Sequence, residues 1–173
     1  SDGHNLSALL LGEGLGFHVA IPPNLWSVDC YHEVEARAIN AGAGVWKLAA
    51  YTAVDAEALP QLHGGYSHVK GRVEKISLMG RVAWVDMVGN VAIKVAKNDL
   101  ATVNGRVWQR LVQAAQQGKL ADLPMLEVHG WMSDRREWEA PIRKQIENGE
   151  RKVFQFKVRH RYDWRLLDAT PSV

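Results

Sequence analysis

Apolar and polar side chains alternate in short segments of the second half of the sequence, and this alternation constrains the fold more than any other feature. It occurs in residues 69–76, 81–87 and 91–95. A period of two is typical of β-strands that bury one face. In the segment 81–87 the two faces consist of Val82, Trp84 and Asp86, and of Ala83, Val85 and Met87. The pattern therefore predicts three consecutive short strands.

A helix and two further strands complete this half of the chain. Residues 104–117 carry apolar side chains every three to four positions, which indicates an amphipathic helix. Strands are predicted at 126–131 and 153–164, on either side of a polar excursion, 133–150, that is expected to be partly helical. Three strands, a helix and two strands is the element order of a five-stranded OB-type barrel. In that barrel we expect the last strand to pair with both the first and the fourth.

Turn residues and charge both divide the sequence near residue 65. Pro60, Gly64 and Gly65 mark a boundary. Residues 1–65 hold two basic and seven acidic side chains, a net charge of −5, whereas residues 66–173 hold 19 and 12, a net charge of +7. A basic half of this kind favours a polyanionic partner. We therefore predict an N-terminal part at 1–46, a connector at 47–65 and a basic β-barrel domain at 66–173.

The first 46 residues predict two helices, at 5–13 and 28–41, around a short strand at 17–21. The motifs of this part are, in order, Leu9-Leu10-Leu11-Gly12-Glu13-Gly14-Leu15-Gly16-Phe17, Pro22-Pro23-Asn24, Tyr31-His32-Glu33-Val34-Glu35-Ala36-Arg37-Ala38 and Ala41-Gly42-Ala43-Gly44-Val45-Trp46. Their order resembles the C-terminal half of the staphylococcal nuclease (thermonuclease) family, over about residues 2–46. The fold class expected for the whole chain is mixed α+β, an OB-like five-stranded β-barrel preceded by the α/β tail of a nuclease-like OB fold.

The resemblance has a clear consequence for catalysis. In the nuclease family the calcium-binding carboxylates, the two catalytic arginines and the general-base glutamate all lie in earlier strands and loops. No position of this sequence matches them, so we expect no catalytic residue here and a chain that is a fragment of a longer protein. No cofactor is expected in this chain, although calcium is possible for the intact family fold. The histidines also lack the spacing of a metal site.

The strand predicted at 153–164 carries the best candidate binding surface. Its basic face consists of Lys157, Arg159, Arg161 and Arg165. Alternate residues of a strand are about 6.6 Å apart, close to the spacing of about 6 to 7 Å between phosphates of an extended nucleic-acid strand. Tyr66, Trp131, Trp138 and Trp164 are candidates for stacking on bases, and Trp138, in the polar excursion, is the tryptophan best placed to be exposed. The alternative is a solvated strand face that protects the sheet from aggregation.

Three functions remain open from the sequence. The first is a non-catalytic fragment whose OB-like domain binds nucleic acid, with single strands favoured. The second is part of a calcium-dependent phosphodiesterase whose catalytic residues lie upstream, and the third is a structural or protein-interaction domain on a decayed nuclease fold.

Self-association is a further possibility, through the incomplete N-terminal half. The composition is that of a soluble protein with no membrane-spanning stretch. A single cysteine, Cys30, leaves both cytoplasmic and exported locations open.

Overall fold

The computed structural model describes residues 5–58 and 62–167. The chain divides into two compact units, Ser1–Thr52 and Ala53–Val173. The division falls inside the predicted connector, 47–65. The described residues of that connector from Ala53 onward belong to the second unit. Each unit is described by itself below.

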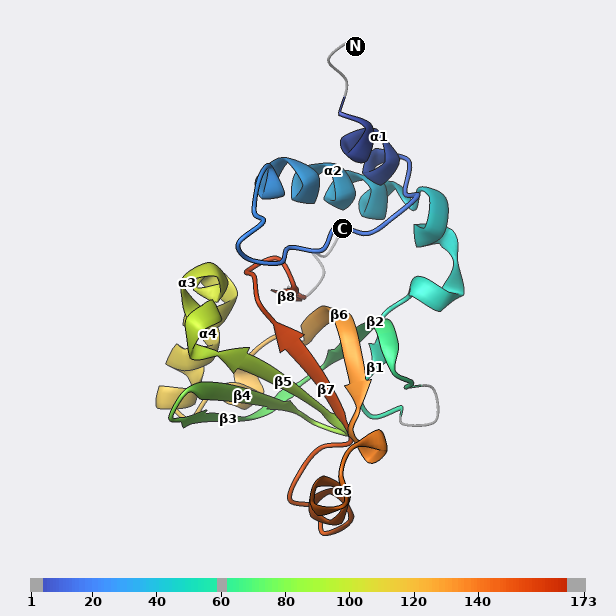
Figure 1. Cartoon of the computed structure of the whole chain (residues 1–173). Coiled ribbons are helices and arrows are strands. Elements are labelled where there is room, and N and C mark those ends of the chain that lie inside the picture. Colours follow the sequence, from blue (N-terminus) through green and yellow to red (C-terminus); the bar gives the residue numbers. More distant parts are fainter. Residues whose placement is uncertain (1–4, 59–61, 168–173) are drawn as a thin grey trace. The chain divides into compact units, whose positions relative to one another are not determined.

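The first unit consists of two α-helices and two short 3-10 helices (Figure 1). They are α1 (Leu6–Gly12), α2 (Val28–Ala41), η1 (Gly44–Lys47) and η2 (Ala49–Tyr51). The side chain of Asn5 caps α1 by accepting a hydrogen bond from the backbone N–H of Ala8 at 3.3 Å. Gly42 ends α2 in the left-handed conformation, as its lack of a Cβ atom allows. Both predicted helices are therefore confirmed.

The strand predicted at 17–21 is wrong. The backbone there is irregular, apart from one isolated bridge between Ile21 and Asn24. The described part of this unit contains no strand with which residues 17–21 could form a sheet. Phe17 instead packs its ring against Trp46, at 5.3 Å between ring centroids, and against Tyr51, at 5.0 Å. The segment is held by aromatic packing rather than by a sheet ladder.

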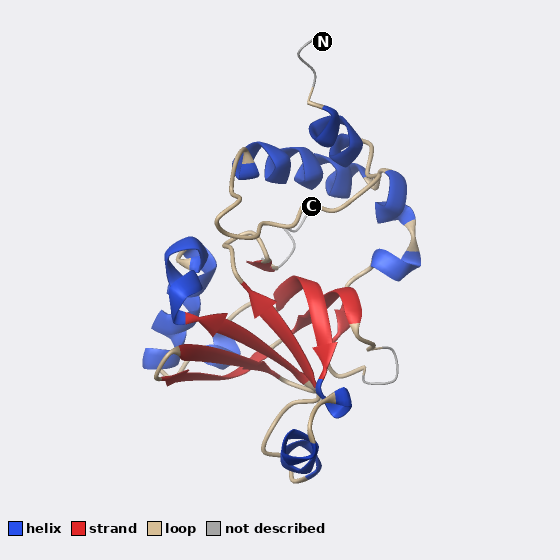
Figure 2. Cartoon of the chain, viewed as in Figure 1, coloured by secondary structure: helices blue, strands red, loops and turns tan. Residues whose placement is uncertain are grey.

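The second unit is built on one curled sheet, drawn in red in Figure 2. Its strands are β1 (Val54–Asp55), β2 (Gly65–Gly71), β3 (Val73–Met79), β4 (Val82–Met87), β5 (Val91–Ala96), β6 (Leu126–Asp134), β7 (Phe154–Val158) and β8 (Trp164–Leu166). The order is β1-β2-β6-β7-β5-β4-β3, and β8 pairs with β6. The protein is thus of mixed α/β composition with a barrel-like sheet, and its described strands outnumber the five that were predicted.

The first predicted strand, residues 69–76, corresponds to two strands, β2 and β3, with a bend between them. Only Arg72 separates β2 from β3. The part before the bend pairs with β6 and the part after it pairs with β4. Because one bent strand contributes to both sides of the sheet order, the sheet curls into a partial barrel (Figure 1).

The pairing of the last strand agrees with the prediction for the fourth strand, β6, and differs from it for the first. β7 pairs in parallel with β5 and antiparallel with β6, and the first strand pairs with β6 instead. The predicted strand 153–164 is also too long. It stops at Val158 because Asp163 turns the chain, accepting hydrogen bonds from the backbone N–H groups of Arg159 and His160 at 2.8 and 2.9 Å.

The helices of this unit lie at the ends of the sheet. The chain leaves β5 through η4 (Lys97–Asp99) into α3 (Leu100–Val103) and α4 (Arg106–Gln116), and η5 (Leu120–Asp122) leads to β6. The segment between β6 and β7 contains η6 (Arg135–Glu137) and α5 (Ala140–Glu147). Figure 1 shows α3 and α4 at one end of the sheet and α5 at the other. The predicted helices are confirmed, within a few residues at their ends.

The core lies on the inner side of the curled sheet. In β4 it includes Ala83, Val85 and Met87, which the alternation predicted to share one face. The other strands and α4 contribute Val69, Val91, Ile93, Val95, Leu111, Leu126, Val128, Met132, Phe154, Phe156 and Val158. The side chains between these positions therefore point to the opposite side of the sheet, which we call the outer face.

Candidate nucleic-acid interface

The outer face carries a row of four side chains that crosses four strands. The register pairs Ser77 of β3 with Trp84 of β4, Trp84 with Lys94 of β5, and Lys94 with Lys157 of β7. Neighbouring strands are about 4.8 Å apart, so the row extends for about 14 Å. The Lys94 Nζ atom is 5.9 Å from the centre of the Trp84 ring. An aromatic ring and two ammonium groups thus lie side by side on one surface.

Arg135 lies next to this row. Its guanidinium carbon is 5.3 Å from the centre of the Trp84 ring and 5.6 Å from that of Trp138. The side chain is only 2% exposed, and burial lowers its pKa below the ordinary value. Its Nη1 donates to the carbonyl of Lys152 at 3.3 Å, whereas no acceptor in residues 5–58 and 62–167 reaches its Nε. A cation buried with so few partners is costly to fold, which is more typical of a functional site than of a structural one.

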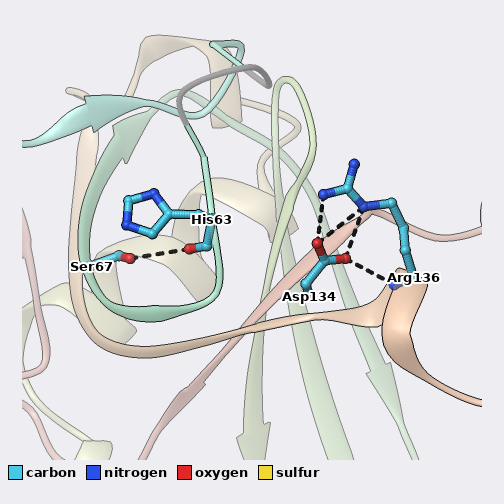
Figure 3. Close-up of polar contacts among 4 residues, drawn as sticks. All are labelled: His63, Ser67, Asp134 and Arg136. Atoms are coloured by element: carbon cyan, nitrogen blue, oxygen red, sulfur yellow. Dashed lines mark hydrogen bonds and ion pairs between the residues drawn. The ribbon is translucent and has the colours of Figure 1, made fainter.

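The turn that presents Arg135 and Trp138 is fixed by its neighbours. Figure 3 shows Arg136 reaching back to the carboxylate of Asp134. The Nε atom of Arg136 donates to Oδ1 at 2.9 Å and to Oδ2 at 3.1 Å, and the backbone N–H of Arg136 also donates to Oδ1 at 2.9 Å. These hydrogen bonds lower the pKa of Asp134 and so keep it ionised. The Arg136 guanidinium also lies 5.2 Å from the ring of Phe154, which ties the turn to β7.

Three further polar contacts lie at the rim of the sheet. Figure 3 also shows Ser67, whose hydroxyl donates to the carbonyl of His63 at 3.5 Å at the start of β2. Lys152, just before β7, lies 3.0 Å from a Glu74 carboxylate oxygen and donates to the carbonyl of Gly89 at 2.9 Å. The ends of β3, β5 and β7 are therefore held together close to Arg135.

Asp86 is the acidic residue of the outer face. It follows Trp84 by two positions in β4 and pairs in register with Lys75 of β3. The side chain is half-buried, and this burial raises the pKa of its carboxyl group. Positive charges on Lys152, Lys75 and Arg135 lower that pKa, and Glu74 raises it further. Asp86 therefore lies in a cationic environment.

The charges around the outer face are unbalanced. Around Trp84 and Asp86, the described charged residues include the cations Lys75, Lys94, Arg135, Lys152 and Lys157 and the anions Glu74 and Asp86. The excess of positive charge attracts polyanions, and it surrounds an aromatic surface.

No family model and no curated protein matches the sequence. Among solved structures, OBody AM3L15 bound to hen egg-white lysozyme aligns with 66% of this chain and 86% of its own, at 14% sequence identity and a TM-score of 0.34. A TM-score this low carries no argument about fold or function.

The structure brings together two of the five site residues predicted from the sequence. Lys157 lies on the outer face, and Trp138, 38% exposed, reaches it through Arg135. Arg159 and Arg161 lie in the turn after β7 rather than on a strand face, and the backbone N–H of Arg161 donates to the carbonyl of Thr102 at 2.9 Å. The single basic strand face is therefore a wrong prediction.

Arg165 and Trp164 also have other roles. Arg165 of β8 forms an ion pair with Glu127 at 3.0 Å. Trp164 was a candidate for stacking on bases, but it is buried and stacks on Trp108 at 6.2 Å between ring centroids. Trp131, another such candidate, is 74% exposed in β6.

Sequence reasoning missed Trp84, Lys94 and Arg135 as site residues. For Trp84 part of the signal was present, because the alternation in residues 81–87 placed it on the face opposite Ala83, Val85 and Met87, although the sequence did not indicate which of the two faces is buried. Arg135 lies in the polar excursion, 133–150, and its partners are two tryptophan rings and a carbonyl group, which no local pattern indicates.

Two further kinds of feature, a metal site and a membrane-spanning helix, are absent from the described residues. The described residues contain no group of three or more His, Cys, Asp or Glu side chains that could hold a metal ion. Within the same residues, no helix has the length and apolar character needed to cross a membrane.

Proposed function

We propose that the second unit is an OB-type domain that binds single-stranded nucleic acid on its outer face. The observation that carries the proposal is the row in which Trp84 lies beside Lys94 and Lys157, with the Arg135–Trp138 turn next to it. Proteins that bind single strands without strong sequence preference combine aromatic rings, on which bases stack, with cations that follow the phosphates. Both components are present on this one surface.

The strand order supports the OB assignment. If β2 and β3 are counted as one bent first strand, the order around the sheet is first, second, third, fifth, fourth and first again. OB domains bind oligonucleotides on the face of the second and third strands, between the loop joining strands one and two and the loop joining strands four and five. Those strands are β4 and β5 here. The corresponding loops are the turn at Gly80 and the segment 135–153, which carries Trp138.

The proposed binding mode assigns a task to each group. One base stacks on the half-buried Trp84 and another on Trp138, and each such contact contributes about 1 to 3 kcal/mol. Lys94 and Lys157 contact phosphates. Arg135 holds the two tryptophans in their mutual position without leaving the buried site.

The first test is a fluorescence-anisotropy titration of the whole chain with a labelled thymidine oligonucleotide of about 12 nucleotides. The two phosphate contacts of Lys94 and Lys157 with a single strand give a salt slope of about −1.4, so affinity is expected to fall about sevenfold between 50 and 200 mM salt. The double variant Lys94→Glu/Lys157→Glu is expected to bind at least tenfold more weakly at the lower salt concentration.

The matched control is Arg106→Glu/Lys119→Glu, which changes the net charge by the same amount at exposed positions at the two ends of the α4 region. Its affinity is expected to stay within twofold of the unchanged protein. Absence of binding at 50 mM salt would exclude the proposal and favour a protein-interaction role. Equal losses in the two double variants would point to a general charge effect instead of this face.

A further inference from the structure

Asp86 is placed to meet the edge of a base that stacks on Trp84. The two residues are separated by one position in β4 and lie on the same face. Their Cα atoms are therefore about 7 Å apart along the strand. A base lying flat on an indole ring extends over several ångströms, so its edge comes within hydrogen-bonding reach of the side chain two positions along.

The carboxylate of Asp86 has acceptor capacity that the protein does not use. Two other shielded carboxylates of this unit are bonded: Asp163 accepts two backbone N–H groups, and Glu127 is paired with Arg165. Among the described residues, the Oδ2 atom of Asp99 also lacks a hydrogen-bond partner, but Asp99 belongs to η4 and not to the outer face. Across the described part of the chain, no donor makes a hydrogen bond to Asp86, although Lys152, Lys75 and Arg135 are close enough to influence its charge. A half-buried carboxylate without a donor is an open acceptor on the proposed binding face.

The chemistry of this acceptor selects among the bases. A carboxylate has two oxygens and no donor when it is ionised. The Watson–Crick edge of guanine presents two adjacent donors, N1–H and the N2 amino group, which match the two oxygens. Cytosine and adenine present one amino donor beside an acceptor nitrogen. Thymine and uracil present one N–H between two carbonyl oxygens, which the carboxylate repels.

We propose that Asp86 reads the base stacked on Trp84 and makes this face prefer guanine over thymine or uracil. The inference rests on the proposed function, because it needs a base on Trp84. The negative charge of Asp86 also repels phosphates, so the backbone follows Lys94 and Lys157 while the base edges point toward Asp86. The cations around Asp86 keep the carboxylate able to accept hydrogen bonds from the base.

The test compares two labelled oligonucleotides, a thymidine 12-mer and the same 12-mer with isolated guanines at every third position. Isolated guanines avoid four-stranded structures. A carboxylate–guanine pair of two hydrogen bonds discriminates by about tenfold. We expect the whole chain to bind the guanine-containing strand about tenfold more tightly, and Asp86→Asn to bind both strands with affinities within twofold of each other.

The matched control is Glu74→Gln, which removes one negative charge from the same neighbourhood but from a residue bonded to Lys152. It is expected to keep the preference for guanine. A second measurement needs no variant: inosine in place of guanine lacks the N2 amino group, and the unchanged protein is expected to lose most of its preference for that strand.

The outcomes separate the two proposals. If neither oligonucleotide binds, the proposed function is wrong and this inference falls with it. If both bind equally to the unchanged protein, or if Asp86→Asn keeps the preference, the face binds single strands but Asp86 does not read the base.

Discussion

The guanidinium group of Arg135 lies 5.3 Å from the centre of the Trp84 ring, and this contact joins two segments that are far apart in the chain. Arg135 follows β6 directly, and Trp84 lies in the middle of β4. The same guanidinium lies 5.6 Å from Trp138. One buried cation therefore sets the positions of two aromatic rings that the proposed function uses.

Replacement of Arg135 by methionine tests whether this cation serves binding more than stability. A buried charge replaced by an apolar side chain of similar volume often leaves stability unchanged or raises it. We expect Arg135→Met to keep the free energy of unfolding within about 1 kcal/mol of the unchanged protein. Oligonucleotide affinity is expected to fall at least fivefold, because Trp138 loses a contact that positions it. The measurements are urea unfolding and fluorescence anisotropy.

Arg143→Met provides the control for Arg135→Met, since Arg143 is exposed in α5. It is expected to leave both measurements unchanged. A large loss of stability together with binding in Arg135→Met would mean that the residue is structural.

The outer face and the abandoned basic strand make different predictions for single cations. Lys157→Gln is expected to reduce the salt slope of oligonucleotide binding by about 0.7, because it removes one phosphate contact. Arg161→Gln, in the turn after β7, and Arg165→Gln, paired with Glu127, are expected to leave the slope unchanged. Anisotropy titrations at four salt concentrations would measure the slopes. A reduced slope for Arg161→Gln would instead support the basic residues predicted from the sequence as the binding surface.

Glu35 makes the stability of the first unit depend on pH. It is 4% exposed, it accepts a hydrogen bond from the backbone N–H of His18 at 2.7 Å, and burial raises its pKa from 4.5 to about 7. The folded protein therefore keeps a proton that the unfolded chain releases near pH 4.5. The contribution of Glu35 to the free energy of unfolding is fully present below pH 4.5. It falls by roughly 3 kcal/mol in all as the pH rises to about 7.

Glu35→Gln keeps the hydrogen-bond acceptor and removes the proton dependence. The free energy of unfolding of the variant, relative to that of the unchanged protein, is expected to rise by about 2 to 3 kcal/mol from pH 5 to pH 8. Hydrogen exchange of the α2 amides, compared between the two proteins at each pH, would measure the gain. The pKa of His18 is lowered by burial, which affects both proteins alike. Equal protection in both proteins at pH 8 would show that Glu35 is not the titrating group.

Asp163 determines where the chain turns after β7. Its carboxylate accepts the backbone N–H groups of Arg159 and His160, and burial raises its pKa to about 6. Asp163→Ala leaves both N–H groups unpaired and is expected to lower the free energy of unfolding by about 2 kcal/mol at pH 7. Asp163→Asn keeps one acceptor oxygen and is expected to cost less than half as much. Urea unfolding would compare the two, and equal costs would contradict the assigned role.

Several elements could be predicted from local sequence alone. The helix at Val28–Ala41, the alternation in β4 and the helix at Arg106–Gln116 were all anticipated, because side-chain periodicity and glycine stops are local properties. The end of β7 was not, since the hydrogen bonds of Asp163 interrupt a pattern that continues to alternate as far as Trp164. The strand expected at 17–21 failed for a related reason: a strand needs a partner, and the sequence does not show whether one is present.

The sequence by itself determined which side chains share a face of each strand, because extended backbone sends alternate residues to opposite sides. It therefore already separated Trp84 from Ala83, Val85 and Met87, whereas only the structure showed which of these two faces is buried. Only the tertiary structure decided that Lys157 lies beside Lys94, since that neighbourhood depends on the parallel pairing of β5 with β7. It also decided that Arg135 lies over Trp84. The reason is physical: contacts between distant segments depend on strand register and on the packing of the whole sheet, which no local pattern encodes.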